Sequence, residues 1–471
     1  MNCKHHLVLT LLILWLAPSH SYGQKKGILK KSPELWLTDP GHGVLFKLQN
    51  DAAGPAKASA AAPVITIDPS KTYQEMDGFG FALTGGSAML ISQMSPGSHS
   101  ILLKELFGTK KNSIGTSYLR ISIGASDLDD HVFSYDDLPA SEKDAHLKGF
   151  SLANDQKALI PVLKKILAIN PRIKILGSPW SPPAWMKTND STEGGHLKPE
   201  YYHAYAQYFV KYIESMAANG IHLDAITIQN EPLNPGNNPS MVMEAPEELN
   251  FIKHNLGPAF KAAKIKTKII LYDHNADRPD YPVTILNDPE ARAFVDGSAF
   301  HLYGGNIEAL SQVHDAYPGK NLYFTEEWVG APGNLMNDMR FHIRDIIIGA
   351  TRNWCKNVIE WNLAADPHQN PHTPGGCTEC LGAITINGDN VTRNPAYYII
   401  AHAAKFVRPG SKRIASNYLE TLPNVAFLTP QGRVVVIVYN DSSAYQAFTI
   451  KVNNKRVPAA LNAGATGTFV F

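Results

Sequence analysis

The sequence predicts an α/β protein: a (β/α)8 TIM barrel with a side β-sandwich built from the N- and C-terminal segments. First, apolar strand-like runs alternate with amphipathic helices from about residue 75 to residue 400, which is typical of repeated βα units. Second, eight such strand runs can be counted, the number that closes this kind of barrel. Third, residues 405–471 change to a β meander that is too short to bury both of its faces alone. We therefore expect the meander to pack with strands from the start of the chain.

Residues 1–23 have the pattern of a signal peptide. Lys4 supplies a positive charge, Leu7–Leu16 is an apolar run, and small residues precede Gln24, where we expect cleavage. A membrane anchor is the alternative, but the apolar run is too short to span a bilayer comfortably. No later run is long and apolar enough, so we expect no transmembrane segment after signal removal and a secreted or periplasmic location.

Residues 24–75 are expected to give the N-terminal strands of the sandwich, and residues 76–404 the barrel. The first segment has strand-like runs at 34–38, 44–48 and 64–67, and its alanine-rich stretch 52–62 is interrupted by glycine and proline, which favours a loop. The expected barrel strands are 78–83, 118–123, 173–176, 225–228, 268–272, 297–301, 322–325 and 358–361. Apolar residues at helical spacing predict helices at 157–169, 201–218 and 337–354. In the C-terminal segment 405–471, sandwich strands are expected at 425–428, 434–439 and 448–452.

The charge of the chain argues against two classes of partner. It has 43 basic and 42 acidic residues, a formal net charge of +1. Nucleic acids and anionic membrane surfaces usually require a basic excess. We therefore expect no nucleic-acid partner.

The most informative motif is Gln229-Asn230-Glu231-Pro232, which ends the apolar run 225–228. Pro232 stops the strand and is expected to push Glu231 toward an extended conformation. The motif places a carboxylate beside a carboxamide at the C-terminal end of a buried strand, where barrel enzymes have their active sites. The alternative, a surface carboxylate at a strand end, is disfavoured by this context.

A second strand run, 321–326, also ends in an acid, Glu326. By strand count the two acids follow the fourth and seventh strands, so that their carboxyls can meet across the barrel mouth. A retaining glycosidase needs two carboxyls about 5–5.5 Å apart, one as nucleophile and one as acid/base. Glu327 competes with Glu326 for the nucleophile role, but strand neighbours face opposite sides, so only one should face the mouth. Asn230 can hydrogen-bond a sugar hydroxyl beside the reacting carbon.

Aromatic residues lie at the ends of several predicted strands: Trp180, Tyr303, Trp328 and Trp361. Each can be core filler, but together they favour a cleft in which sugar rings stack on aromatic faces. Arg120 can position a catalytic carboxylate and Asp127 can bind sugar hydroxyls, and a structural ion pair is the alternative. The run 127–130 lacks the ligand spacing of an EF-hand, so we expect no calcium there.

Cys377 and Cys380 form a Cys-x-x-Cys pair flanked by glycine and proline residues. Half a zinc site and a redox pair are alternatives, but a second cysteine pair is missing and the flanks indicate a loop. In an exported protein, a disulfide that staples this loop is favoured. Cys355 lies just ahead of an apolar strand and is expected to be a buried free thiol.

Several motifs in order along the chain resemble glycoside hydrolase family 30, the glucosylceramidase family. They are Gly78-Phe-Gly80, Leu119-Arg-Ile-Ser122, Ala125-Ser-Asp127, Ser178-Pro-Trp-Ser-Pro-Pro-Ala-Trp-Met-Lys-Thr-Asn189, Gln229-Asn-Glu-Pro232, His301-Leu-Tyr303, Thr325-Glu326 with Val329-Gly330, and Trp361-Asn-Leu363. The resemblance implies a retaining β-glycosidase with Glu231 as acid/base and Glu326 as nucleophile, which needs no metal or organic cofactor. The positions that align with sugar-binding residues of the family are Asp127, Trp180, Asn230, Tyr303 and Trp361.

Segment 364–380 follows the eighth predicted strand and departs from the animal lysosomal members of this family. It is more similar to microbial members, several of which cut β-1,6-glucan. We therefore expect a secreted retaining β-glycoside hydrolase whose carbohydrate substrate is a β-glucan, with the β-1,6 linkage first, or a glucosylated lipid such as glucosylceramide. A xylan- or fucoside-directed member of the family and a non-catalytic carbohydrate-binding protein are the alternatives.

Overall fold

The computed structural model describes Met1 and residues 33–49, 62–110, 112–139 and 141–471. The predicted signal peptide and nearly all of the alanine-rich stretch lie outside the described residues. Within the part of the chain that is described, no helix is both long enough and apolar enough to cross a membrane.

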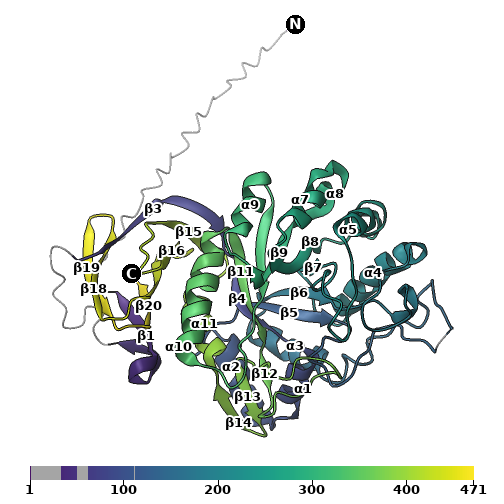
Figure 1. Ribbon diagram of the computed structural model, residues 1–471, viewed down its shortest axis with the longest axis horizontal. Helices are drawn as coiled ribbons and strands as arrows, with labels where there is room; N and C mark the ends of the chain where they lie inside the picture. Colours follow the sequence, from purple (N-terminus) through teal and green to yellow (C-terminus); the bar gives the residue numbers. More distant parts are fainter. Residues whose placement is uncertain (2–32, 50–61, 111, 140) are drawn as a thin grey trace. The chain divides into compact units, whose positions relative to one another are not determined.

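Eight strands, each parallel to its neighbours, form a closed barrel (Figure 1). In chain order they are β4 (Gly78–Ala82), β5 (Tyr118–Ile123), β6 (Lys174–Pro179), β7 (Ala225–Thr227), β8 (Lys268–Ala276), β9 (Val295–Gly305), β10 (Asn321–Glu326) and β11 (Cys355–Asn362). Each strand run predicted from the sequence contributes one of them, so the expected (β/α)8 barrel is confirmed. The ordinals also hold: Glu231 follows the fourth strand and Glu326 ends the seventh.

Helices lie on the outside of the barrel, between successive strands and, in the case of the last helix, after the final barrel strand (Figure 1). They are α1 (Gly85–Gln93), α2 (Pro96–Phe107), α3 (Leu159–Ile169), α4 (Tyr202–Ala218), α5 (Ala245–Phe251), α6 (Gly257–Ala262), α7 (Asp280–Asn287), α8 (Pro289–Phe294), α9 (Ala309–Ala316), α10 (Leu335–Phe341) and α11 (Pro395–Ala404). Short 3-10 helices span Pro40–His42, Ala184–Met186 and Pro199–Tyr201. The predicted helix 337–354 is α10 followed by a π-helical stretch, His342–Ala350, and a second π-helical stretch, Ile252–Leu256, joins α5 to α6.

Strands from both ends of the chain form one sheet of nine strands, in the order β19-β18-β3-β15-β16-β17-β20-β1-β2. Their bounds are β1 (Glu34–Asp39), β2 (Val44–Gln49), β3 (Val64–Glu75), β15 (Lys412–Ser416), β16 (Asn424–Leu428), β17 (Val434–Tyr439), β18 (Gln446–Val452), β19 (Lys455–Leu461) and β20 (Thr466–Val470). In Figure 1 the purple strand β1 lies beside the yellow strand β20, and Glu34 is paired with Val470. Ile65, Ile450 and Phe469 share one buried apolar cluster, so the expected sandwich from both ends of the chain is confirmed.

Helix α11 follows the last barrel strand and contacts the sandwich strands β2 and β20. Its residue His402 is buried and hydrogen-bonds through its two ring nitrogens with the hydroxyls of Thr468 and Thr38, each at 2.8 Å. Burial without an acidic partner lowers the pKa of His402 to about 3. The junction therefore contains a neutral histidine that links the barrel to both terminal segments of the sandwich.

A small third sheet lies after the last barrel strand, made of β12 (Ala364–Ala365), β13 (Ile384–Asn387) and β14 (Asn390–Arg393). β12 pairs with β13, so the intervening residues 366–383 form a closed loop. This loop contains Cys377 and Cys380.

Candidate active site

The barrel interior contains two successive layers of side chains. The lower layer is apolar and buried: Tyr118, Leu176, Ala225, Ile270, Ala299, Tyr323 and Ile359. Because side chains alternate along a strand, the residue two positions further along faces the same side. In six of the strands these residues form an upper layer that is polar except for one tryptophan: Arg120, Ser178, Thr227, His301, Thr325 and Trp361. The change from apolar to polar lies toward the C-terminal ends of the strands, where barrels of this kind have their active sites.

Strand β8 supplies the seventh member of the upper layer through a backbone irregularity. Tyr272 and Asp273 have positive φ angles of 71° and 67°, and the pairing with β9 shifts register at this point. The irregularity brings Asp273, three residues after Ile270 rather than two, into contact with the upper layer. Left-handed conformations of non-glycine residues cost on the order of 1–3 kcal/mol each and cluster at functional sites.

Asp273 is the buried anion of this layer. Its carboxylate accepts hydrogen bonds from the hydroxyls of Thr227 (2.7 Å) and Thr325 (2.6 Å) and from Nη2 of Arg120 (2.8 Å). Burial opposes ionisation of Asp273, but Arg120 and then His301 hold its pKa well below the ordinary value. Asp273 is therefore ionised at neutral pH.

Arg120 joins Asp273 to the acid at the end of β10. Its Nη1 donates to Oε2 of Glu326 at 2.5 Å, and its Nη2 also donates to Oδ1 of Asn230 at 2.6 Å. The arginine side chain has no solvent exposure. Because Arg120 also pairs with Asp273 at 2.8 Å, its charge is balanced by two buried carboxylates. Arg120 thus fixes the position of the Glu326 carboxylate.

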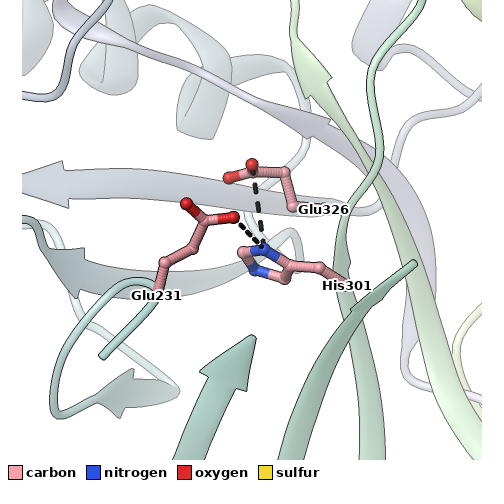
Figure 2. Close-up of side chains that lie close together, drawn as sticks. All are labelled: Glu231, His301 and Glu326. Carbon is pink, nitrogen blue, oxygen red and sulfur yellow. Dashed lines mark hydrogen bonds and ion pairs between the residues drawn. The ribbon is translucent and has the colours of Figure 1, made fainter. Parts of the chain in front are cut away.

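Glu231 and Glu326 point toward each other above His301 (Figure 2). Nδ1 of His301 lies 3.3 Å from Oε1 of Glu231 and 3.8 Å from Oε1 of Glu326. One oxygen of each acid and one nitrogen of His301 all lie within 4.8 Å of one another. The two carboxyls are therefore close enough for one of them to attack a sugar carbon while the other transfers a proton.

The backbone of Glu231 corrects the expectation of an extended conformation. Its φ angle is 45°, in the left-handed region. The Glu231 N–H donates to the carbonyl of Asp273 at 3.0 Å, and the Glu231 carbonyl accepts from the N–H of Asn234 at 2.9 Å, which closes a turn around Pro232. These hydrogen bonds outweigh the local preference of a residue before proline. Oε2 of Glu231 also accepts from the side chains of Asn234 (2.7 Å) and Asn237 (3.2 Å).

The charges around the pair fix the protonation of His301. Burial disfavours its imidazolium, but Glu326, Asp273 and Glu231 together raise its pKa to about 10. His301, Glu231 and Glu326 could offer three ligand atoms to a metal ion. Protonated His301 has no lone pair left for a metal, however, and its Nε2 already faces Asp273 at 3.3 Å. The site fits a proton-transfer centre better than a metal centre.

The two acids differ in their proton affinity. Burial opposes the ionisation of Glu231, but His301, whose hydrogen bond and charge both act on it, lowers its pKa to about 2. Burial raises the pKa of Glu326; His301 and Arg120 act to lower it, and the carboxylates Glu231 and Asp273 add to the rise. The directions of the two shifts favour ionisation of Glu231 over ionisation of Glu326.

A cleft of about 670 Å³ opens above these acids. Its lining includes most of the predicted site residues, namely Asp127, Trp180, Glu231, Tyr303, Glu326, Trp361, Cys377 and Cys380, and also Trp328. The rings of Trp180 and Trp361 are stacked with centroids 5.4 Å apart. A polar wall of Asn234, Asn237, His274, Asn275, Asp277 and Arg278 stands beside Glu231. An apolar ring surface beside convergent polar groups suits a sugar.

Asn230 and Tyr303 occupy different depths of the site. Asn230 is buried, and its carboxamide oxygen accepts the hydrogen bond from Arg120, which leaves its N–H2 group for a ligand. Tyr303 lines the cleft, and its hydroxyl donates to Oε1 of Glu326 at 3.0 Å.

Glu327 faces away from the cleft, as strand alternation requires for a neighbour of Glu326. It is buried beside His342 and Glu360, and burial raises its pKa to about 8. It lines a separate small cavity. Glu326 is thus the acid of this pair that reaches Glu231.

Asp127 is held at the cleft wall by the cysteine-containing loop. Its Oδ2 accepts the N–H of Cys377 at 3.3 Å. Burial, and next the charge of Glu326, raise the pKa of Asp127 to about 7. Cys377 and Cys380 form a disulfide, and Cys355 is a buried free thiol.

Sequence reasoning missed Asp273, Asn234 and Asn237. The predicted strand ended at Tyr272, and nothing in the local sequence signals that Asp273 turns into the barrel. His301 was part of the quoted His-Leu-Tyr motif but was not given a role. Its position two residues before Tyr303 on the same strand end was the available signal.

The family model of the glycosyl hydrolase family 30 TIM-barrel domain matches residues 76–407, and the model of the glycosyl hydrolase family 30 beta sandwich domain matches residues 410–469. An endo-1,6-β-D-glucanase of Aspergillus fumigatus is 34% identical over 452 residues, which cover 86% of this chain and 90% of that protein. The lysosomal acid glucosylceramidase of Mus musculus is 30% identical over 424 residues, which cover 84% of this chain and 80% of that protein. A solved endo-β1,6-glucanase structure superposes with a TM-score of 0.85 at 35% identity, covering 93% of this chain and 99% of that one.

Proposed function

Because the chain belongs to glycosyl hydrolase family 30, whose members are retaining glycoside hydrolases, we propose that it cleaves β-1,6-glucan by double displacement at Glu231 and Glu326. The observation that carries the proposal is the approach of the two carboxyls, which have one oxygen each within 4.8 Å. Retaining glycosidases use a separation of about 5–5.5 Å, whereas inverting enzymes need about 6.5–9.5 Å to admit a water.

In the proposed first step, an oxygen of the Glu326 carboxylate attacks the anomeric carbon. The bond from that carbon to the leaving sugar breaks, and Glu231 donates its proton to the leaving oxygen. In the second step, Glu231 removes a proton from water, the water oxygen bonds to the anomeric carbon, and the ester bond to Glu326 breaks. Two displacements return the β configuration and restore both acids.

The first step needs a proton on Glu231 and a negative charge on Glu326, the reverse of the unliganded preference. We propose that substrate supplies the difference, because a sugar in the cleft buries the Glu231 carboxyl further and burial favours its neutral form. Arg120 at 2.5 Å and the Tyr303 hydroxyl at 3.0 Å then stabilise the ionised nucleophile. We propose that substrate binding itself moves the shared proton to Glu231.

The choice of β-1,6-glucan is supported by the relatives rather than by a contact in the cleft. Three endo-1,6-β-glucanases are 34–36% identical over most of this chain, and the mouse glucosylceramidase is 30% identical. The cleft supports a sugar in general through stacked Trp180 and Trp361. Glucosylceramide stays the second candidate because that relative also aligns over 84% of this chain.

The test is product analysis with a panel of substrates. Purified enzyme is incubated with β-1,6-glucan, β-1,3-glucan, xylan and detergent-dispersed glucosylceramide. We expect β-1,6-linked oligosaccharides from the first and little from the others, and no product from Glu326→Ala. Turnover of glucosylceramide or xylan alone would contradict the proposed substrate while leaving the reaction class intact.

We also propose that the chain is exported after cleavage before Gln24, on the basis of the charged start and the apolar run 7–16. Expression of the full chain in a secreting host, followed by N-terminal sequencing of the mature protein, tests this. A mature protein that begins at Gln24 outside the cytoplasm is the expected result. Retention of residue 1 in a cytoplasmic protein would contradict it.

A further inference from the structure

The segment Thr373–Leu381, which we name the strap, crosses the mouth of the barrel. It lies in the loop between β12 and β13, after the last barrel strand. Its residues contact the loops that follow β5, β7 and β10, so one short segment touches three separate walls of the cleft. The disulfide between Cys377 and Cys380 lies within it.

The first contact of the strap is with Asp127, in the loop after β5. The N–H of Thr373 donates to the Asp127 carbonyl at 2.9 Å, and the Thr373 hydroxyl lies 3.3 Å from the same oxygen. A side chain at Gly376 would come within 2.4 Å of that carbonyl, so the backbones are in close approach here. The carboxylate of Asp127 accepts a hydrogen bond from the Cys377 N–H at 3.3 Å. Backbone and side chain of Asp127 are thus both held by the strap.

The other contacts fix the two ends of the strap. Near its start, the Asn238 side chain donates to the Pro374 carbonyl at 2.9 Å, and the Thr373 hydroxyl donates to the Asn238 carbonyl at 2.5 Å. Near its end, the N–H of Ala331 donates to the Glu379 carbonyl at 2.7 Å, and the N–H of Leu381 donates to the Val329 carbonyl at 3.1 Å. The middle, residues 375–378, has fewer such anchors, and there the disulfide closes the turn.

The disulfide also faces the sugar cleft. Both cysteines line it, and Cys380 belongs to a buried cluster with Leu128, Trp180 and Trp361, against which Cys377 packs. The sulfur bridge therefore sits between the carboxylate of Asp127 and the stacked tryptophans. A change in the conformation of the turn closed by the disulfide would therefore alter both Asp127, which can hydrogen-bond a sugar, and the tryptophans on which the same sugar can stack.

We propose that the Cys377–Cys380 disulfide is a positioning element for substrate binding, which holds the Cys377 N–H on Asp127 so that this carboxylate stays oriented toward sugar hydroxyls. The inference rests on the proposed function in that it assumes a sugar ring in this cleft. It assigns the disulfide to substrate affinity rather than to stability of the barrel.

The electrostatics of Asp127 give the proposal a specific signature. Burial and the charges of Glu326 and Glu231 raise its pKa, and the Cys377 N–H is one of the contacts that lower it. Loss of that N–H would raise the pKa further from about 7. If ionised Asp127 binds the sugar, kcat/KM would then reach its plateau only at higher pH.

The experiment compares the oxidised enzyme, the same enzyme after reduction with TCEP, and the double variant C377S/C380S. We expect KM for β-1,6-glucan to rise about three- to tenfold, because the 3.3 Å hydrogen bond from the Cys377 N–H to Asp127 is weakened rather than removed, with kcat changed less than about twofold. The acid limb of kcat/KM should move to higher pH. If the double variant folds poorly, reduction of the folded wild-type enzyme still tests the proposal. The variant C355A controls for effects of the free thiol.

A further arm decides between positioning and general structural support. In an Asp127→Ala background, which has no side-chain acceptor for the Cys377 N–H, reduction should change KM by less than about twofold, because the effects of residues that act through one contact are not additive. An unchanged KM after verified reduction, or an equal KM rise in the Asp127→Ala background, would overturn the proposal.

Binding of 1-deoxynojirimycin, measured by calorimetry, separates this result from the substrate assignment. The affinity should fall three- to tenfold on reduction, as for KM, even if β-1,6-glucan proves not to be cleaved. If the enzyme does not cleave β-1,6-glucan but its affinity for the inhibitor still falls on reduction, only the proposed substrate is contradicted. An inhibitor affinity that ignores the redox state would contradict the role of the disulfide.

Discussion

The two layers inside the barrel are adjacent along the strands but differ in composition: one is apolar and the other is mostly polar and charged. The lower layer has seven buried side chains that form one apolar cluster, including Ile270 and Tyr323. The upper layer buries Arg120, Asp273 and His301 with almost no solvent contact and adds left-handed backbone at Tyr272 and Asp273. The lower layer stabilises the fold by burying apolar surface. The upper layer buries charges, which is unfavourable unless each charge has its partners.

This difference teaches where stability and activity are located in the molecule. Substitutions in the lower layer should change unfolding and leave turnover alone, because no lower-layer side chain reaches the cleft. Substitutions in the cleft acids should do the reverse.

The largest effect is expected for the two acids. Glu326→Ala should lower kcat by about 10⁴-fold or more, because the proposed nucleophile is lost, and Glu231→Gln by about 10²–10⁴-fold. Melting temperatures should change little, because Glu326→Ala leaves Arg120 paired with Asp273 and Glu231→Gln keeps a side chain that can hydrogen-bond. Steady-state kinetics and calorimetry measure both quantities.

Glu327→Gln is the matched control, because Glu327 is the buried strand neighbour of Glu326 that faces away from the cleft. Its kcat should remain within a few-fold of the wild-type value. A loss as large as that of Glu326→Ala would mean that the wrong acid has been assigned.

The opposite behaviour is expected from Ile270→Ala in the lower layer. Ile270 has no exposed surface, so its truncation should lower the free energy of unfolding by about 2–5 kcal/mol. The kcat of the folded fraction should change less than about twofold. Chemical denaturation combined with kinetics checks this, and a large fall in kcat with unchanged stability would break the division between the layers.

Two buried histidines extend the comparison to pH. His301 among carboxylates has its pKa raised to about 10, whereas His402 among threonine hydroxyls has its pKa lowered to about 3. Below pH 6.5 His402 is protonated in the unfolded chain but stays neutral in the native state. The free energy of unfolding therefore falls as the pH falls. Between pH 6.5 and 4.5 the expected loss from His402 is about 2.3 kcal/mol.

His402→Gln should remove this part of the acid sensitivity. The measurement is the free energy of unfolding of wild type and variant at several pH values, and the difference between the two slopes isolates the histidine from the carboxyl groups. Parallel curves for the two proteins would show that His402 does not carry the effect.

The smallest effect is expected for Tyr303→Phe. The substitution removes the hydroxyl that donates to Oε1 of Glu326 at 3.0 Å but keeps the ring. Loss of one hydrogen bond to a charged group should lower kcat/KM about tenfold without a change in melting temperature. No change in kcat/KM would indicate that Arg120 alone holds the nucleophile.

Much of this arrangement could be predicted from the sequence because its signals are local. The eight apolar runs, the Gln-Asn-Glu-Pro motif and the acid after the seventh run each lie within a few residues. Strand order then placed Glu231 and Glu326 at one mouth.

The rest depends on contacts that no local pattern encodes. Asp273 enters the interior because the backbone of β8 turns left-handed. Glu231 is not extended because its N–H donates to the carbonyl of Asp273, which is distant in the sequence. The strap likewise meets Asp127 from about 250 residues further along the chain. Such contacts become visible only once the barrel has closed.

The most direct test of the central claim, that Glu231 and Glu326 act as a pair with distinct roles, is rescue by azide. Glu326→Ala and Glu231→Ala are each incubated with 2,4-dinitrophenyl β-glucoside and sodium azide, and the anomer of the product is identified by NMR. The account predicts α-glucosyl azide from Glu326→Ala, because azide replaces the nucleophile, and β-glucosyl azide from Glu231→Ala, because azide attacks the glucosyl-enzyme. The reverse assignment of anomers would contradict it.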